Sequence, residues 1–284
     1  MRRHHVPVAI AALVGAYLAL YSSVLAKLAH DWLHDDNYSH GVLILPLALY
    51  FVWERRDRLA ALEPAPRLFG LAVVAAGLTV LLAGLLGAEL FLARVSMLIT
   101  LIGGVLFVLG WKALRILAFP IAFLLLMIPI PAIIFNEIAF PLQLLASRVG
   151  EAGLTLVGVP ILREGNVMIL AHTTLEVAEA CSGIRSLISL LTLGIVFGYF
   201  TDPRTGVRTL IALSTIPVAI VTNGLRVAGT GVAAHYIGPE AAQGFFHTFS
   251  GWMVFVVAFI LIFGLARLLI RLKPMPAPAL PAAA

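Results

Sequence analysis

A single thiol occurs in the chain of 284 residues, and it lies in a short polar segment between long apolar runs. This thiol belongs to Cys181, within EACSGIRS (179–186). A cysteine attacks as its thiolate, so a nucleophilic cysteine needs a base or a positive charge beside it. Cys181 lies just before a predicted helix, whose first amides favour a thiolate, and Arg185 follows one helical turn later. The alternative is a small buried residue, which is common for free cysteines.

Arg226 and His247 offer the other groups that such chemistry requires. Arg226 lies in TNGLRVAGTG, an apolar and glycine-rich stretch where a guanidinium is costly unless it meets an anion or water. His247 lies just before the last apolar run, in FFHTFSG. Either side chain alone is also consistent with an interfacial residue. Together, a cysteine nucleophile, a histidine that protonates a leaving amine and an arginine that stabilises an oxyanion describe acyl transfer through a thioester.

The elements that position these groups are those of a membrane protein. Hydrophobic residues make up 61% of the chain and charged residues only 12%, against roughly a quarter charged in soluble domains. The net charge of +5 is spread in short basic groups between apolar runs, which argues against nucleic acid as a partner and indicates contact with lipid. One cysteine permits no internal disulfide.

Apolar runs predict an all-α polytopic membrane protein with about eight transmembrane helices. The first run is too long for a cleaved signal peptide and is predicted to be retained. Lys and Arg gather in the loops of one side, which predicts that both termini are cytoplasmic and that Cys181, Arg226 and His247 share the outer face. The predicted spans are near residues 6–26, 39–53, 68–88, 90–110, 114–134, 184–200, 207–222 and 248–267.

Three segments depart from this pattern. The charges within residues 135–160 predict a helix that lies in the outer interface rather than crossing. ILREGNVMIL followed by TTLEVAEA predicts a short β-hairpin, which has to lie outside the hydrocarbon. The Pro/Ala-rich residues 274–284 predict a disordered tail, so residues 1–273 are expected to form a single membrane domain.

The loop KLAHDWLHDDNYSH (27–40) is rich in histidine and aspartate, which are metal-binding residue types. Their spacing matches no zinc signature, and a solvated outer loop commonly holds such residues. We therefore expect neither a metal nor a cofactor. Glu176 and Glu179, beside the cysteine, either contact a substrate or keep the hairpin solvated, and we favour the second role.

The polar segments resemble the three ordered motifs of the exosortase/archaeosortase family. CSGIRS (181–186) is similar to Cys-Ser-Gly-x-x-Ser/Ala, NGLR (223–226) to Asn-x-x-Arg, and HTFSG (247–251) to His-x-x-x-Gly. The similarity extends over most of residues 20–270 and includes NYSHG (37–41). The resemblance implies a cysteine peptidase and transpeptidase of the bacterial inner membrane. It also implies substrates that are exported proteins with a C-terminal Pro-Glu-Pro motif, a transmembrane helix and a basic cluster.

By this resemblance, Cys181 would be the nucleophile, Arg226 the stabiliser of the oxyanion and His247 the acid and base. Ser182, Gly183 and Asn223 match motif positions and would support the site, as would Arg185 and Glu179.

Two other functions stay open at this point. A small-molecule or anion transporter would use Arg226 as its anion site, but the predicted spans hold few ionisable residues and show no inverted repeat. A non-catalytic subunit of an envelope polysaccharide machine would not need the thiol of Cys181.

Overall fold

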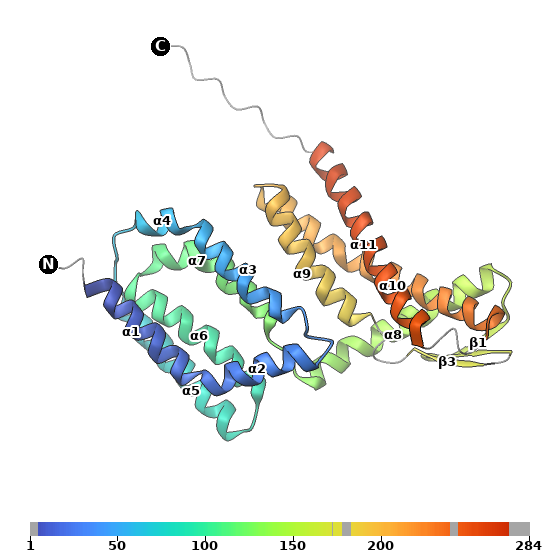
Figure 1. Ribbon diagram of the computed structural model, residues 1–284, viewed down its shortest axis with the longest axis horizontal. Helices are drawn as coiled ribbons and strands as arrows, with labels where there is room; N and C mark the ends of the chain where they lie inside the picture. The colour runs from blue at the N-terminus through green and yellow to red at the C-terminus, as the bar shows by residue number, and fades with distance from the viewer. Residues whose placement is uncertain (1–4, 172, 178–182, 239–243, 273–284) are drawn as a thin grey trace, which may run out of the picture. The chain divides into compact units, whose positions relative to one another are not determined.

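The computed structural model describes residues 5–171, 173–177, 183–238 and 244–272, without the side chains of 5–10, 244–248 and 250 (Figure 1). The fold is that of an all-α polytopic membrane protein with a small sheet, as predicted. Within the described residues, six helices are long and apolar enough to cross a membrane, or seven if a bent pair counts as one span. The six are α5 (Phe69–Leu86), α6 (Leu90–Val108), α8 (Ala132–Leu156), α9 (Ile184–Thr201), α10 (Thr205–Tyr236) and α11 (Gly244–Leu272).

The described residues thus provide fewer candidate spans than the eight predicted. The bent pair is formed by α1 (His5–Leu20) and α2 (Ser22–His34), which meet at an angle of 66°. The run at 39–53 forms α3 (Gly41–Glu54), an apolar helix of 14 residues, which is followed by the short α4 (Arg56–Ala60).

The span predicted at 114–134 is wrong, because the helix breaks. Residues Trp111–Phe123 form α7, and a 3₁₀ turn, η1 (Leu124–Met127), ends in the extended residue Ile128. Pro129 and Pro131 follow. A proline has no N–H for a helix and disfavours the helical region for the residue before it. Single prolines lie inside α3, α8 and α10, but two prolines within three residues end the helix here.

The following helix also differs from the prediction. We expected residues 135–160 to lie in the interface, but α8 is one helix of 25 residues that contains a window apolar enough to span a membrane. The charges that prompted the prediction are too widely spaced to lower the hydropathy of that window enough. Length and composition therefore class α8 with the membrane-crossing helices.

The chain divides into two compact units, Met1–Pro131 and Ala132–Ala284. In the first unit, α5 and α6 pack along Gly70, Gly77 and Gly84. These glycines recur every seventh residue and therefore keep to one face of α5. A Cβ atom on Gly77 would lie 2.3 Å from Oγ1 of Thr100 on α6. The absence of side chains is what lets these two helices approach so closely.

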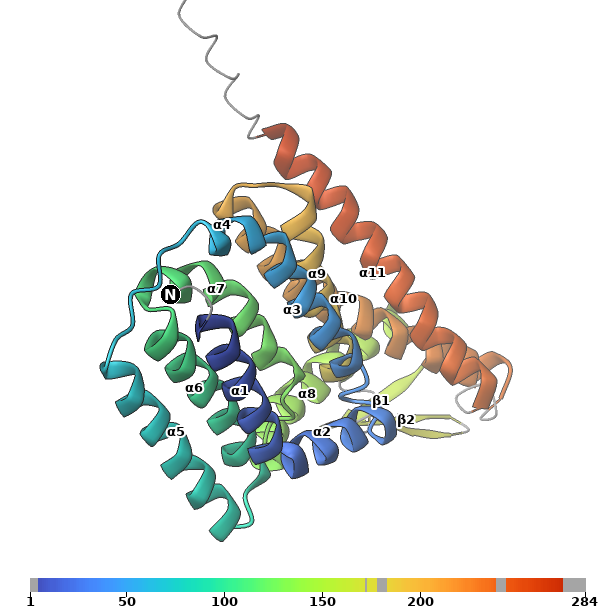
Figure 2. The same cartoon turned by 60° about the vertical axis from the view of Figure 1, so that its left-hand side comes forward.

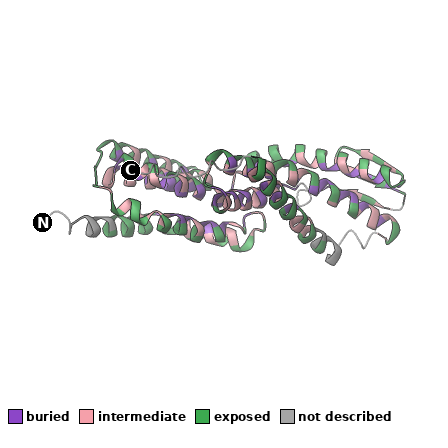
Figure 3. Cartoon of the chain, turned by 90° about the horizontal axis from the view of Figure 1, so that it is seen from above, coloured by how far each residue is buried: buried purple, intermediate pink, exposed green. Residues whose placement is uncertain are grey.

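In the second unit, α10 is the central helix and packs against α8, α9 and α11 (Figure 2). Gly150 of α8 faces Val227 of α10, and Gly194 of α9 faces Thr215, so small residues again permit close contact. Outside these seams, large apolar side chains such as Leu261 and Trp252 are exposed, and Figure 3 colours much of the long helices as exposed. Such a surface is typical of helices that face lipid.

A three-stranded antiparallel sheet in the order β1-β2-β3 lies beside α8 and α10. The strands are β1 (Ile161–Glu164), β2 (Val167–Leu170) and β3 (Thr174–Glu176). The predicted hairpin is β1–β2, with Gly165 at φ 65° in its turn, and β3 extends it by one strand. Met168 and Leu170 pack with Ala146, Leu154 and Val227 in one core. The sheet is thus fixed to the helices by its apolar face.

Candidate functional site

Four of the eight predicted site residues are described in full: Gly183, Arg185, Asn223 and Arg226. Glu179, Cys181 and Ser182 lie outside the described residues. His247 lies in the first turn of α11, and its side chain is outside the described set. The described residues still contain part of each of the three motifs.

The first two motifs meet at Gly183 and Asn223. Gly183 precedes the first residue of α9 with φ 81°, a left-handed conformation that costs little only for glycine. A Cβ atom there would lie 2.8 Å from both Cγ and Nδ2 of Asn223, whose side chain is buried in α10. Glycine is therefore required at residue 183 twice, by its backbone conformation and by the close approach of Asn223.

The second and third motifs meet at Arg226 and Gly251. A Cβ atom on Gly251 would lie 3.9 Å from Cζ and from Nη2 of Arg226. The guanidinium therefore reaches across from α10 to α11. Asn223 and Arg226 are three residues apart on α10, so their side chains lie on neighbouring turns of one face. Parts of all three motifs are thus gathered around one turn of α10.

An apolar groove of about 340 Å³ runs between α10 and α11 beside this turn, and Arg226 is its charged residue. Two threonines add hydroxyl groups, while the other positions are apolar. A charge on an apolar wall has few competing water contacts and is thus an effective donor to a developing negative charge. The groove is lined by Thr222, Leu225, Arg226, Gly229, Thr230, Ala233, Phe249, Met253, Val254 and Val257.

Arg185 lies in the first turn of α9 and is half-buried. It stands two residues after Gly183, at the end of the helix where the contact with Asn223 occurs. Its predicted effect on the thiol of Cys181 stays a prediction.

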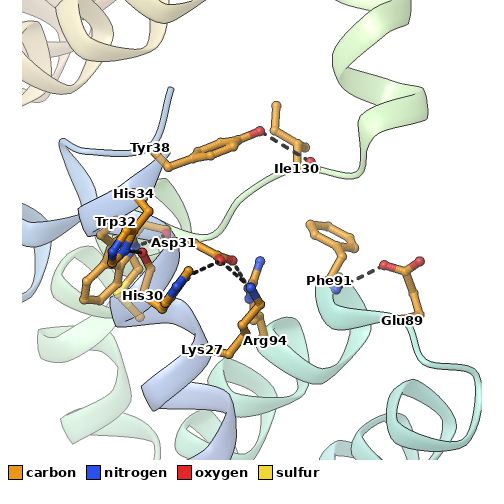
Figure 4. Close-up of polar contacts among 11 residues, drawn as sticks. Lys27, His30, Asp31, Trp32, His34, Tyr38, Glu89, Phe91, Arg94 and Ile130 are labelled. Atoms are coloured by element: carbon orange, nitrogen blue, oxygen red, sulfur yellow. Dashed lines mark hydrogen bonds and ion pairs between the residues drawn. The ribbon is translucent and has the colours of Figure 1, made fainter. Parts of the chain in front are cut away.

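The histidine- and aspartate-rich segment 27–40 lies in the first unit and has different neighbours. It was predicted to be a loop, but its first half is the end of α2. Asp31 of α2 pairs with Arg94 of α6 and lies 2.9 Å from Nζ of Lys27 (Figure 4). The Arg94 side chain is only 4% exposed, and the ion pair with Asp31 balances its charge within the protein. His30 and His34 stack on each other. Within the described part of the chain, no group of three His, Cys, Asp or Glu is arranged to hold a metal ion.

The same segment supplies hydrogen-bond donors to the broken end of α7. Trp32 donates from Nε1 to the carbonyl of Met127 at 2.9 Å, and Tyr38 donates to the carbonyl of Ile130 (Figure 4). Nε2 of His40 lies 3.1 Å from the carbonyl of Leu126. Burial lowers the pKa of His40, which favours a neutral ring that donates this bond. These side chains replace the amide partners that the break removes.

This role of residues 27–40 was not predicted. The signal was present in Pro129 and Pro131, which predict a helix end with unpaired carbonyls. The donors stand about 90 residues earlier in the chain, so the pairing itself depends on tertiary structure. Gly251 was also not singled out, although it belongs to a quoted motif and lies beside Arg226.

Residues 32–264 match the family model described as transmembrane exosortase. No curated protein and no solved structure matches the chain significantly. The matched range contains all three motifs and extends over most of each compact unit.

Proposed function

The chain belongs to the transmembrane exosortase family, and we propose that it is a membrane cysteine peptidase and transpeptidase with Cys181 as its nucleophile. Its substrates are exported proteins that end in a Pro-Glu-Pro motif, an apolar helix and a basic cluster. It works in the bacterial inner membrane, with both termini in the cytoplasm and the site on the outer face. The basic loops of one side support this orientation.

The observation that carries the proposal is the meeting of the three motifs on α10. Gly183 packs closely against Asn223, and the guanidinium of Arg226 lies beside Gly251, 3.9 Å from where a Cβ atom would be. Cys181 stands two residues before Gly183, and an extended chain covers about 3.5 Å per residue. His247 stands four residues before Gly251, one turn earlier in α11. Cys181 and His247 are therefore close in sequence to this meeting point, which supports the proposal that both act on one substrate bond.

The proposed reaction has two steps. The Cys181 thiolate attacks the scissile carbonyl carbon, and Arg226 donates hydrogen bonds to the oxyanion that forms. The C–N bond breaks as His247 protonates the leaving amine, which leaves an acyl thioester on Cys181. His247 then takes a proton from an acceptor amine or water, which attacks the thioester carbonyl carbon; the C–S bond breaks and the Cys181 thiolate is released. The sorting helix departs in the first step and the exported domain in the second.

The groove between α10 and α11 supports the proposed substrate class. Its apolar wall suits an apolar helix, and Arg226 lies along the same wall. A helix that follows the cleaved segment would thus place its preceding residues near the guanidinium. If the protein were a transporter, the contact between Gly183 and Asn223 would have no evident role.

The test is processing of an exported reporter that carries such a C-terminal signal, in cells that produce this chain or a variant. We expect the Cys181→Ala and Cys181→Ser variants to accumulate in the membrane and to leave the reporter uncleaved. Gly206→Ala is the matched control, because a Cβ atom at Gly206 meets nothing within 4 Å. Normal mature reporter in the Cys181→Ala strain would exclude the peptidase and favour a non-catalytic subunit.

A further inference from the structure

The outer edge of β3 has backbone groups that no strand within the described residues uses. In an antiparallel pair, alternate residues direct both N–H and C=O toward the same neighbour. The amide of Leu170 donates to the carbonyl of Thr173, and the amide of Val177 donates to the carbonyl of Asn166. Thr173, Leu175 and Val177 therefore face β2, so Thr174 and Glu176 direct their backbone groups away from the sheet.

This edge is accessible and close in sequence to the nucleophile. Thr174 and Glu176 are exposed, whereas Leu175 and Val177 pack against the core. The apolar face of the sheet holds β3 in place, which leaves its edge as a rigid template. Glu176 stands five residues before Cys181. A peptide paired with this edge would be extended, the conformation in which a scissile bond is open to attack.

We propose that β3 binds the substrate by adding its Pro-Glu-Pro segment as a further antiparallel strand, an inference that rests on the function proposed above. Prolines lack an N–H and cannot donate to a ladder. In Pro-Glu-Pro they occupy alternate positions, so both face away when the glutamate faces β3. The glutamate then presents its N–H and C=O to the edge. The second proline also restrains the glutamate to an extended backbone, so the peptide loses little conformational freedom when it pairs.

The register follows from charge. The substrate glutamate pairs either with Thr174 or with Glu176, since these residues have the outward backbone groups. Like charges directly opposite each other destabilise a sheet, which disfavours Glu176. The glutamate therefore pairs with Thr174: the amide of Thr174 donates to the carbonyl of the glutamate, and the glutamate amide donates to the carbonyl of Thr174.

The test compares Thr174→Pro with Gly206→Ala in reporter processing. Proline is tolerated at an outward edge position, so Thr174→Pro keeps a strand-compatible residue but removes the outward N–H. Gly206→Ala lies away from the site, and its Cβ atom meets nothing within 4 Å. We expect Thr174→Pro to slow processing about tenfold and Gly206→Ala to leave it unchanged. Processing at the native rate by Thr174→Pro overturns the pairing, whereas processing by Cys181→Ala overturns the underlying function.

A second measurement keeps the proposal testable if Thr174→Pro does not accumulate. The native enzyme, in detergent micelles, is given a synthetic Pro-Glu-Pro peptide with an apolar C-terminal segment. A matched peptide has an ester in place of the Pro–Glu amide, which removes only the glutamate N–H. We expect the ester peptide to be cleaved about tenfold more slowly. Equal cleavage of both peptides contradicts pairing through the glutamate.

Discussion

Arg226 is the described side chain in which the proposed chemistry can be tested most directly. Its guanidinium lies beside Gly251 of α11, 3.9 Å from where a Cβ atom on that glycine would be. Lysine keeps the positive charge but loses the planar fork that can hold a carbonyl oxygen and a second acceptor together. We expect Arg226→Lys to lose most of the processing activity, by about 100-fold, while the protein still accumulates in the membrane. The measurement is the rate of reporter cleavage at matched protein level. A native rate would make Arg226 an anchor.

Gly183 is a second residue whose substitution has a sharply defined outcome. An alanine there combines a strained φ of 81° with a Cβ atom 2.8 Å from the Asn223 side chain. Gly158 has a similar φ of 78° but open space around its Cβ position. Gly158→Ala thus has the backbone strain, of about 1 kcal/mol, without the clash. We expect Gly183→Ala to abolish processing and Gly158→Ala to preserve it. Equal activities would show that the contact with Asn223 is unimportant.

At the residue scale, the sequence revealed the identity of the site residues better than their contacts. Arg226 and Asn223 were identifiable because a charge and an amide in an apolar stretch need a reason to be there. The neighbours of Arg226 and Trp32 could not be predicted, because both contacts join residues far apart in the chain. The spacing of residues along the sequence indicates which of them lie on the same helix or strand. It does not indicate which helices and strands pack against each other.

The close packing of α5 against α6 requires glycine at Gly77. A Cβ atom on Gly77 would lie 2.3 Å from Oγ1 and 2.8 Å from the backbone nitrogen of Thr100. Gly104 of α6 has nothing within 4 Å of its Cβ position. We expect Gly77→Ala to destabilise the protein by about 1–3 kcal/mol and Gly104→Ala to have little effect. Thermal unfolding in detergent micelles measures both. Equal stability of the two variants would contradict close packing at this seam.

The turn between α9 and α10 gives a pH-dependent contribution to stability. Asp202 is 3% exposed, and Nη2 of Arg204 lies 2.6 Å from its carboxylate. The hydrogen bond from Arg204 lowers the pKa of Asp202 despite burial. The stabilisation is therefore complete above the ordinary value of about 3.9 and is lost as pH falls toward the lowered pKa.

We expect Asp202→Asn to remove this dependence on pH. The variant should be less stable than the native protein at neutral pH, and the difference should shrink below about pH 4. Unfolding of both proteins across an acid series measures it. A difference that stays constant with pH would show that Asp202 acts through its shape rather than its charge.

At the element scale, some elements could be predicted from the sequence and others could not. The β1–β2 hairpin was predictable because Glu-Gly-Asn marks its turn and Gly165 adopts a positive φ. The end of α7 was missed because hydropathy alone hides Pro129 and Pro131 within an apolar run. The length of α8 was predicted well, but its suitability as a membrane span was missed, since its charges were given more weight than its average hydropathy.

The whole molecule combines two helical units, each of which leaves much apolar surface exposed. Composition predicted this class securely, since a chain with 61% hydrophobic residues cannot bury all of them. The proposed sidedness depends on the basic loops alone. The family match extends into both units and adds no information on sidedness.

The length of α10 has a consequence for the membranes in which the proposed activity is possible. Its 32 residues extend over about 48 Å, whereas the hydrocarbon core of a typical bilayer is about 30 Å thick. Arg226 lies about 30 Å along the helix from Thr205 and would therefore stand at the outer boundary of the hydrocarbon. A thicker bilayer would draw the guanidinium toward the lipid tails, where a charge is costly.

We therefore expect activity to depend on the acyl-chain length of the surrounding lipid. In proteoliposomes, peptide cleavage should be fastest near the thickness of an ordinary bacterial membrane and should fall as the acyl chains lengthen. Tilt of α10 would soften this decline but not remove it, since Arg226 keeps its place along the helix. A rate independent of acyl-chain length would place Arg226 in a water-filled setting. If the decline is found, hydrophobic matching selects the membranes in which this protein can process its substrates.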